Sequence, residues 1–293
     1  MNSLSCYQQL PVWTQATIPS GFQKKHNTKA GTWAKLTILK GELHFAMMTE
    51  SGEIQSEHVF SVEQQPPFIE PLAWHKIVSS SADIECQLSF YCQPEDYFAK
   101  KYKLSAPHSE IVAALPVLQG HQGTESIQAL DLGCGKGRNA LFLSQHGVQV
   151  DAWDNKPESI EKLNQIIQAE QIHNLHPQLH DLNQASPIEG QYNFIYCTVV
   201  MMFLPPSSIP KLIQNMQHAT KSQGLNLIVC VMDSDDCPAQ ADFSFSFKTA
   251  ELKAYYQDWN ILKYSEEIGQ LHRTDEQGLR IQQRFAILLA QKK

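Results

Sequence analysis

A glycine-rich segment between two short apolar stretches constrains this chain more than any other part of its sequence. The segment reads ALDLGCGKGRNALFLSQHGVQVDAWD over residues 129–154, with glycines at positions 133, 135 and 137. A helical pattern follows the glycines, and a second apolar run ends in Asp154. A strand, a glycine turn, a helix and a second strand form a βαβ unit, whose turn lies at the ligand-binding edge of a parallel sheet.

The spacing of these glycines distinguishes between two classes of cofactor. Dinucleotide-binding turns follow G-x-G-x-x-G, but here the third glycine comes one residue early and Arg138 stands in its place. Asp131, two residues before the first glycine, also fits that fingerprint poorly. The pattern D-x-G-x-G-x-G instead resembles the S-adenosyl-L-methionine-dependent methyltransferases with a Rossmann-like fold. A nicotinamide oxidoreductase is therefore the weaker alternative.

Three aspartates near strand ends suit the parts of this cofactor. Glycines such as Gly133 and Gly135 let the backbone approach a ligand closely. Asp131 is placed to anchor the ammonium end, directly or through water, and Asp154 can accept from both ribose hydroxyls. Asp181 follows the third strand and can receive the adenine amino group. The three acids can also be read as ordinary caps, but their shared position at C-terminal strand ends favours ligand binding.

The pattern of apolar residues and turn signals changes near residue 93. Residues 1–92 contain short apolar stretches separated by turn signals, which predicts a small β-sandwich or a cupin-like barrel. Its expected strands cover residues 32–48, 58–63, 74–80 and 84–92. From residue 93 helical and strand patterns alternate, which predicts a doubly wound, mostly parallel sheet of seven strands with an antiparallel C-terminal hairpin. The expected domains are therefore 1–92 and 93–293.

Composition argues against several kinds of partner. The formal net charge is -7, whereas nucleic-acid binding needs a basic surface. No apolar run is long enough to span a membrane, and the N-terminus does not read as a secretory signal. The seven cysteines include no C-x-x-C, which favours reduced thiols in the cytoplasm.

From about residue 95 to its end, the chain resembles the tellurite-resistance methyltransferases of the TehB family. The segments that carry the resemblance are DYFAKKYKL (96–104), LDLGCGKGRN (130–139), TVVMMFL (198–204), NLIVCVMDSDD (226–236) and LHRTD (271–275). Residues 30–45 and 66–77 resemble the small β domain that precedes this methyltransferase in some members. The resemblance implies methyl transfer from S-adenosyl-L-methionine to tellurite- and selenite-type oxyanions, leaving S-adenosyl-L-homocysteine and conferring resistance by detoxification.

The resemblance also implies which residues bind and react. Arg273 orients the oxyanion, His272 removes a proton so that the chalcogen lone pair attacks the methyl group, and Asp233 holds one of them or helps the proton leave. The alternative is a surface turn with an Arg–Asp pair, such as Arg273 with Asp275. The residues expected to contact the cofactor are Tyr97, Lys101, His108, Asp131, Gly133, Gly135, Arg138, Asp154, Asp181, Leu182 and Thr198.

Several alternatives stay open at this stage. His26, Glu42, His44 and His75 are spread as in cupin metal sites, but the usual H-x-H is missing, so no metal is expected. The acceptor can be another small nucleophile, such as a thiol or a halide. A non-catalytic sensor that binds its ligand through the β domain is the remaining class, and the sequence leaves a homo-oligomer open.

Overall fold

The computed structural model describes residues 4–121, 126–184 and 186–293, with the backbone but not the side chains of His121 and His272. The chain divides into two compact units, Met1–Leu104 and Ser105–Lys293. The short helix α1 (Tyr97–Tyr102) therefore belongs to the first unit. One reason is that the ammonium of Lys100 donates to Thr32 Oγ1 at 2.9 Å and to the Ala30 carbonyl at 3.1 Å.

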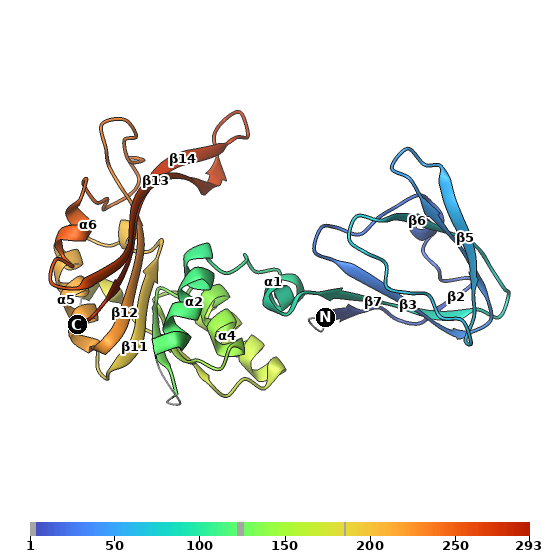
Figure 1. The fold of residues 1–293 in the computed structure, drawn as a ribbon, viewed down its shortest axis with the longest axis horizontal. Helices are drawn as coiled ribbons and strands as arrows, with labels where there is room; N and C mark the ends of the chain where they lie inside the picture. The colour runs from blue at the N-terminus through green and yellow to red at the C-terminus, as the bar shows by residue number, and fades with distance from the viewer. Residues whose placement is uncertain (1–3, 122–125, 185) are drawn as a thin grey trace. The chain divides into compact units, whose positions relative to one another are not determined.

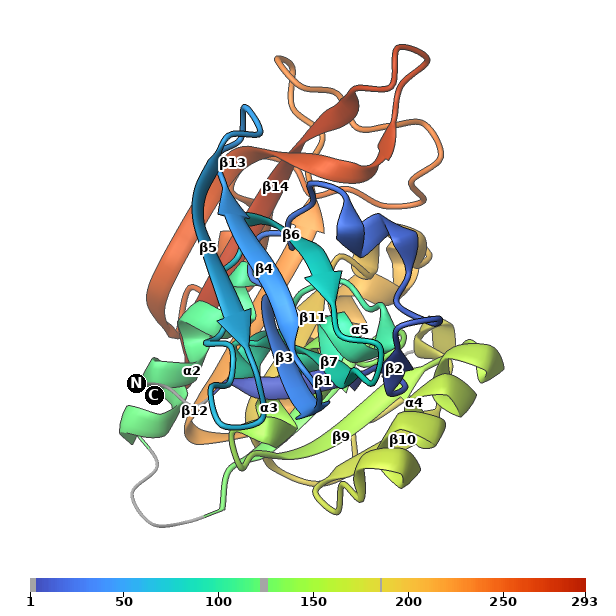
Figure 2. The same ribbon diagram turned by 90° about the vertical axis from the view of Figure 1, so that its right-hand side faces the viewer.

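The N-terminal unit consists of two antiparallel sheets, as the recurring turn signals predicted. In the first sheet, β7 pairs with each of the other three strands. Its strands are β1 (Ser5–Gln9), β2 (Trp13–Thr14), β3 (Trp33–Lys40) and β7 (Glu85–Cys92). In the second sheet, β4 lies between the other two strands (Figure 2). These strands are β4 (Leu43–Met48), β5 (Ile54–Phe60) and β6 (Trp74–Ser80).

One predicted strand has different bounds. We expected it at residues 58–63, but β5 ends at Phe60. The Ser61 hydroxyl accepts from the backbone N–H groups of Glu63 at 3.2 Å and Gln64 at 3.3 Å. Such a local serine turn competes with strand pairing and ends the strand.

The C-terminal unit is built on a seven-stranded sheet in the order β10-β9-β8-β11-β12-β14-β13. The strands from β10 to β12 run parallel, whereas β14 is antiparallel to both of its neighbours. This arrangement confirms the predicted sheet with its antiparallel hairpin. The strands are β8 (Gln128–Leu132), β9 (Gln149–Asp154), β10 (Leu175–Leu179), β11 (Tyr192–Thr198), β12 (Thr220–Val231), β13 (Asn260–Thr274) and β14 (Arg280–Gln291).

Helices cover both faces of this sheet. Figure 1 shows α2 and α4 on one side of the strands, and α5 and α6 on the other. The helices are α2 (Ser109–His121), α3 (Arg138–Gln145), α4 (Pro157–Glu170), α5 (Ile209–Ala219) and α6 (Glu251–Ala254). In α5 the buried residues Ile209, Leu212, Ile213 and Met216 recur at helical spacing, which gives the helix one apolar face toward the sheet. None of the helices in the described ranges has the length and hydrophobicity to cross a membrane.

The direction of connection reverses around β8, which lies between β9 and β11. In an open α/β sheet, such a switch point opens a crevice at the C-terminal ends of the strands. Asp131 lies near the end of β8, Asp154 ends β9 and Thr198 ends β11. The fold therefore brings these three predicted site residues to one edge of the sheet.

Candidate functional site

The glycine turn at this edge depends on glycine for two different reasons. Gly133 has φ +79°, and a Cβ there would lie 2.4 Å from Val200 Cγ2. Gly137 has φ +88°, and its Cβ would lie 2.5 Å from Leu163 Cδ1. Gly135 has φ +53° but faces open space, with no atom within 4 Å of a Cβ. Two glycines thus allow close packing, while Gly135 leaves a surface that a ligand can approach.

A cavity of about 420 Å³ opens over this turn, and we call it the glycine-turn cavity. Its lining comes from the turn and from the segments after β9, β10 and β11: Gly133, Gly135, Asp154, Asn155, Lys156, Ser159, His180, Leu182, Asn183, Val199, Val200, Phe203 and Leu204. Asp154 is held in its wall, because Oδ2 accepts from the Gly135 N–H at 2.8 Å and Oδ1 accepts from the Lys156 N–H at 2.9 Å. Each carboxylate oxygen keeps a lone pair for a further donor. Asp154 can therefore accept two further hydrogen bonds.

Asp181, which follows β10, has contacts that the sequence did not predict. Asp181 Oδ1 accepts from the backbone and side-chain nitrogens of Asn183, at 3.0 and 2.8 Å. Asp181 is not among the residues that line the glycine-turn cavity, whereas Leu182 and His180 are. The His180 ring stacks on Trp153 with centroids 4.1 Å apart. His180 was not among the residues predicted from the sequence, although its place beside Asp181 was a usable signal.

Asp131 is buried beneath the turn, with 1% of its surface exposed. Neither its Oδ2 nor the Tyr196 hydroxyl makes a hydrogen bond of standard geometry within the described residues. Burial raises the pKa of Asp131 to about 8, against the opposing influence of Tyr196 and the Arg138 guanidinium. A buried carboxyl oxygen without a standard hydrogen bond is costly, and an ammonium group is a donor that suits it.

Asn139 connects three segments that the sequence assigned to the site. It is 4% exposed, and its amide nitrogen donates to Thr198 Oγ1 at 3.0 Å. Its amide oxygen accepts from the backbone N–H of His108 at 2.9 Å. Asn139 thus ties the start of α2 and the end of β11 to α3. It stands inside the quoted LDLGCGKGRN motif, but nothing in the motif alone revealed this role.

A second cavity of about 770 Å³ lies against the C-terminal hairpin, and we call it the hairpin cavity. His108, Arg138 and Arg273 all contribute to its lining. Its remaining wall includes Glu110, Val199, Met202, Phe203, Val229, Phe243, Lys263, Phe285, Ile287 and residues 267–271. Lys263 donates to both carboxylate oxygens of Glu110, at 2.7 and 2.8 Å. The cavity therefore combines apolar walls with several charged groups.

Val199 and Phe203 line both cavities. Val199 has φ +54°, a conformation that is rare for a β-branched residue. Its N–H donates to the Val229 carbonyl at 2.7 Å, which helps to hold it there. Backbone strain of this kind concentrates at functional sites.

The predicted reacting residues have neighbours that the sequence did not reveal. Arg273 lines the hairpin cavity, and its guanidinium pairs with Asp242, with Nη2 donating to Oδ1 at 3.0 Å. The surface Arg–Asp pair given as the alternative does form, but with Asp242 in place of Asp275, whose Oδ1 accepts from the Leu279 N–H at 2.8 Å. Asp233 pairs with Lys248 and accepts from the Ala239 N–H at 3.0 Å. The side chain of His272 lies outside the described part of the structure.

Two predicted cofactor contacts, Tyr97 and Lys101, lie on α1 in the N-terminal unit. Lys101 Nζ donates to the Tyr97 hydroxyl at 2.7 Å. The four residues considered for a metal separate into two groups: His26 and His75 line a cavity, whereas Glu42 and His44 are exposed. His44 points outward because Leu43 and Phe45 on either side of it are buried. Within the described ranges, no three His, Cys, Asp or Glu side chains come together to hold a metal.

The sheet order, the glycine turn and the carboxylates at the strand ends define a class I methyltransferase fold of the S-adenosyl-L-methionine-dependent kind. The family profile described as "Tellurite resistance protein TehB" matches residues 90–289, and the profile "TehB-like domain" matches residues 8–88. The chain belongs to the TehB family.

Similar proteins span both units. The "Probable S-adenosyl-L-methionine-dependent methyltransferase TehB" of Haemophilus influenzae (strain 10810) is 48% identical over 292 residues, covering 100% of this chain and 99% of the relative. "Hemagglutinin 1" of Eikenella corrodens is 39% identical over 245 residues, covering 84% of this chain and 79% of that protein. The crystal structure of TehB from Haemophilus influenzae has a TM-score of 0.91 at 48% identity, covering 100% and 99% of the two chains.

Proposed function

We propose that this chain transfers the methyl group of S-adenosyl-L-methionine to chalcogen oxyanions of the tellurite and selenite type. The observation that carries the proposal is the pair of cavities that share Val199 and Phe203. One is suited to an adenosine, and the other presents the Arg273 guanidinium. Membership of the TehB family supports a link to tellurite resistance, and the name of the Haemophilus relative supports methyl transfer from S-adenosyl-L-methionine.

The residues around the glycine turn fit the cofactor part by part. Asp154 accepts from the ribose hydroxyls with its remaining lone pairs, and Gly135 leaves room for close approach of the ligand. Asp131 serves the ammonium group. Ser109, the first residue of α2, offers its backbone N–H to the amino-acid carboxylate. When bound, S-adenosyl-L-methionine supplies an electrophilic methyl group on a positively charged sulfur.

Three further contacts complete the proposed cofactor site. Leu182 packs against the adenosine from the wall of the glycine-turn cavity. Asp181 Oδ2 receives the adenine amino group, while Oδ1 stays bonded to Asn183. Thr198 is held by Asn139 at the end of β11, and Arg138, which precedes Asn139 at the start of α3, adds positive charge.

The acceptor is bound by the hairpin. Arg273 orients the oxyanion through the parallel N–H donors of its guanidinium. His272 takes the proton of a protonated oxyanion, the chalcogen lone pair forms the new bond to the methyl carbon, and the bond from that carbon to sulfur breaks. Asp233 assists the removal of the proton. Alignment of the two reactants provides most of the rate, because no covalent enzyme intermediate is needed.

The test is headspace mass spectrometry of the full-length protein with S-adenosyl-L-methionine and either tellurite or selenite under reducing conditions. Methylated product should form only with the cofactor, and the added reductant then converts it to the volatile species that is detected. Arg273→Ala should lower kcat/KM for tellurite by roughly 100-fold, since charge-assisted hydrogen bonds are worth about 1.5–3 kcal/mol, while S-adenosyl-L-homocysteine still binds. Arg280→Ala, an exposed hairpin arginine that lines neither cavity, is the matched control. Unchanged kinetics in Arg273→Ala would remove its assigned role.

A second acceptor class is favoured by the size of the hairpin cavity. At about 770 Å³, with Phe243, Phe285 and Ile287 in its wall, it has more apolar space than a bare oxyanion needs. Small organic thiols match that space and react by the same displacement. If tellurite and selenite give no product while S-adenosyl-L-homocysteine binds tightly, methyl transfer to thiols becomes the preferred function.

We place the reaction in the cytoplasm because of the state of the cysteines. All seven are free, and five of them are buried. Burial raises the pKa of the Cys86 thiol to about 11, so this thiol is unreactive at neutral pH. Free structural thiols are typical of a reducing compartment.

A further inference from the structure

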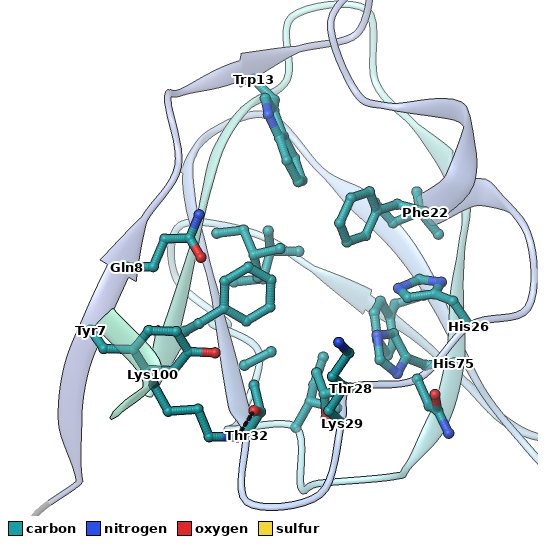
Figure 3. Close-up of a pocket in the computed structure, with 18 residues that line it drawn as sticks. Tyr7, Gln8, Trp13, Phe22, His26, Thr28, Lys29, Thr32, His75 and Lys100 are labelled. Carbon is teal, nitrogen blue, oxygen red and sulfur yellow. Dashed lines mark hydrogen bonds between the residues drawn. The ribbon is translucent and has the colours of Figure 1, made fainter. Parts of the chain in front are cut away.

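The N-terminal unit holds a cavity of its own, of about 460 Å³, between its two sheets (Figure 3). Its wall includes the aromatic rings of Trp13, Phe22, Phe45 and Phe90. Trp13 and Phe45 are only 6% and 5% exposed, so these rings belong to the core of the unit. A cavity of this size with apolar walls is typical of sites for small organic molecules.

Two histidines interrupt the apolar wall at one place. His26 and His75 lie side by side in Figure 3, with ring centroids 4.2 Å apart. They are held together by their backbones, since each N–H donates to the other residue's carbonyl, at 3.0 and 2.9 Å. The sequence separates them widely, so only the fold creates this pair.

The hydrogen bonds of the two rings determine which nitrogen carries the proton. His26 Nδ1 lies 2.8 Å from the Lys24 carbonyl, and His75 Nδ1 lies 2.8 Å from the Ala73 carbonyl. A carbonyl only accepts, so each Nδ1 must donate. In a neutral imidazole the other nitrogen, Nε2, is then an acceptor.

His75 is neutral at physiological pH, because burial lowers its pKa to about 4. Its Nε2 therefore carries a lone pair in the cavity wall. His26 Nε2 is also buried and has no hydrogen-bond partner within the described residues. A buried polar atom without a partner is costly, and here the missing partner is a donor.

The opposite side of the cavity has different chemistry. Tyr7, Gln8 and Lys100 lie there, across from the histidines (Figure 3). Lys100 is fixed by its hydrogen bond to the buried Thr32, 2.9 Å away. The cavity thus has acceptors at the histidine end, aromatic rings along its length and donors at the far end.

We propose that this cavity binds a small aromatic molecule that carries a hydroxyl or N–H donor. The ring system packs among Trp13, Phe22, Phe45 and Phe90, and the donor reaches the His26–His75 pair. A metal ion fits less well, because two imidazoles are the whole set of potential ligands and no third joins them in the described residues. The site is separate from the methyl-transfer chemistry proposed for the C-terminal unit.

The test uses two probes that differ only in the donor, 2-naphthol and 2-methoxynaphthalene. Both are titrated by calorimetry into the full-length protein saturated with S-adenosyl-L-homocysteine. We expect 2-naphthol to bind with one site per chain and about tenfold more tightly than its methyl ether, the value of one hydrogen bond. Equal affinities, or no binding of either probe, would overturn the proposal.

Variants locate the site. Ala34 is buried in the cavity wall, so Ala34→Phe should fill the space and abolish binding of both probes. His75→Leu should reduce the affinity for 2-naphthol to that for the methyl ether. His58→Leu, the same change at an exposed histidine outside the cavity, should leave both affinities unchanged.

Two results would count against this assignment. Binding of 2-naphthol that survives in Ala34→Phe would place the probe elsewhere in the chain. Stoichiometric Zn²⁺ binding that is lost in both His26→Leu and His75→Leu, without any binding of 2-naphthol, would make the pair a metal site. If His75→Leu does not fold, the comparison of the two probes on the unaltered protein still decides the question.

Discussion

The two cavities of the C-terminal unit are built in opposite ways. Around the glycine-turn cavity, a carboxylate at a strand end is held by backbone N–H groups, as Asp154 is by Gly135 and Lys156. Around the hairpin cavity, side chains pair with side chains, as Arg273 does with Asp242. The side chains of that pair are 44% and 57% exposed, so solvent screens their attraction. The difference suggests a rigid cofactor end and an adjustable acceptor end.

A substitution at the glycine-turn cavity should have the largest effect, here on cofactor affinity. We expect Asp154→Ala to weaken binding of S-adenosyl-L-homocysteine by about 100-fold, because hydrogen bonds to a charged group are worth roughly 1.5–3 kcal/mol. Asp181→Ala should cost about tenfold or less, since Asp181 does not line the cavity. Calorimetry measures both. Equal losses would show that the two carboxylates contribute alike and that lining the cavity does not matter.

Close packing at the glycine turn predicts a loss of stability when Gly133 is replaced. Gly133→Ala should lower the free energy of unfolding by about 2–3 kcal/mol, since a positive φ costs about 1 kcal/mol and the clash with Val200 adds to it. Gly278 has a similar φ of +80° but open space around its Cα, so Gly278→Ala should cost only about 1 kcal/mol. Urea unfolding compares them, and equal costs would argue against the tight turn.

A smaller effect concerns the pH dependence of protein stability and of cofactor binding, which Asp131 should set at the glycine-turn cavity. The raised pKa of Asp131, about 8, means that the folded protein keeps a proton that the unfolded chain loses near pH 4. Raising the pH from 4 to 8 should therefore lower the free energy of unfolding of the unliganded protein. Cofactor binding favours the charged carboxylate, so the affinity for S-adenosyl-L-homocysteine should rise about tenfold from pH 6 to pH 7.

Asp131→Asn is the control for this pH dependence, because it removes the titrating group. Both slopes, for unfolding by urea and for binding by calorimetry, should become flatter in the variant. A pH-independent affinity in the unaltered protein would contradict the proposed ammonium contact.

A substitution beside the hairpin cavity should have the smallest effect, here on the kinetics with tellurite. Asp242→Asn removes the charge that pairs with Arg273 but keeps a hydrogen-bond acceptor. Because exposed ion pairs are worth roughly 0.2–1 kcal/mol, we expect KM for tellurite to change by about threefold or less, with kcat unchanged. Steady-state kinetics measure both constants. A loss as large as that of Arg273→Ala would mean that the hairpin cavity is as rigid as the cofactor end.

The fold of the C-terminal unit could be predicted because its signals are local. The glycine turn, the alternation of strands and helices, and the acids at strand ends each lie within a few residues of the structure they specify. The positions of Asp131, Asp154 and Thr198 at one sheet edge follow from that topology alone. The end of β5 was less predictable, because a hydrogen bond of Ser61 decided it.

The contacts around the acceptor end could not be predicted, because they join distant segments. Arg273 and Asp242 are brought together by tertiary structure, and Asp275 was the nearer acid in the sequence. The bridging role of Asn139 depends on His108 and Thr198 reaching it from two other elements. The strain at Val199 likewise depends on packing at the end of β11, and the sequence TVVMMFL around it gives no sign of it.

The wall that Val199 and Phe203 share has a kinetic consequence. A ligand in either cavity contacts the same two side chains, so we expect occupancy of one cavity to affect binding in the other. Binding of the two reactants should then be mutually dependent, and by thermodynamic linkage each must alter the affinity of the other by the same factor. In a product-inhibition experiment, S-adenosyl-L-homocysteine should therefore shift the apparent affinity for the acceptor as well as compete with the methyl donor.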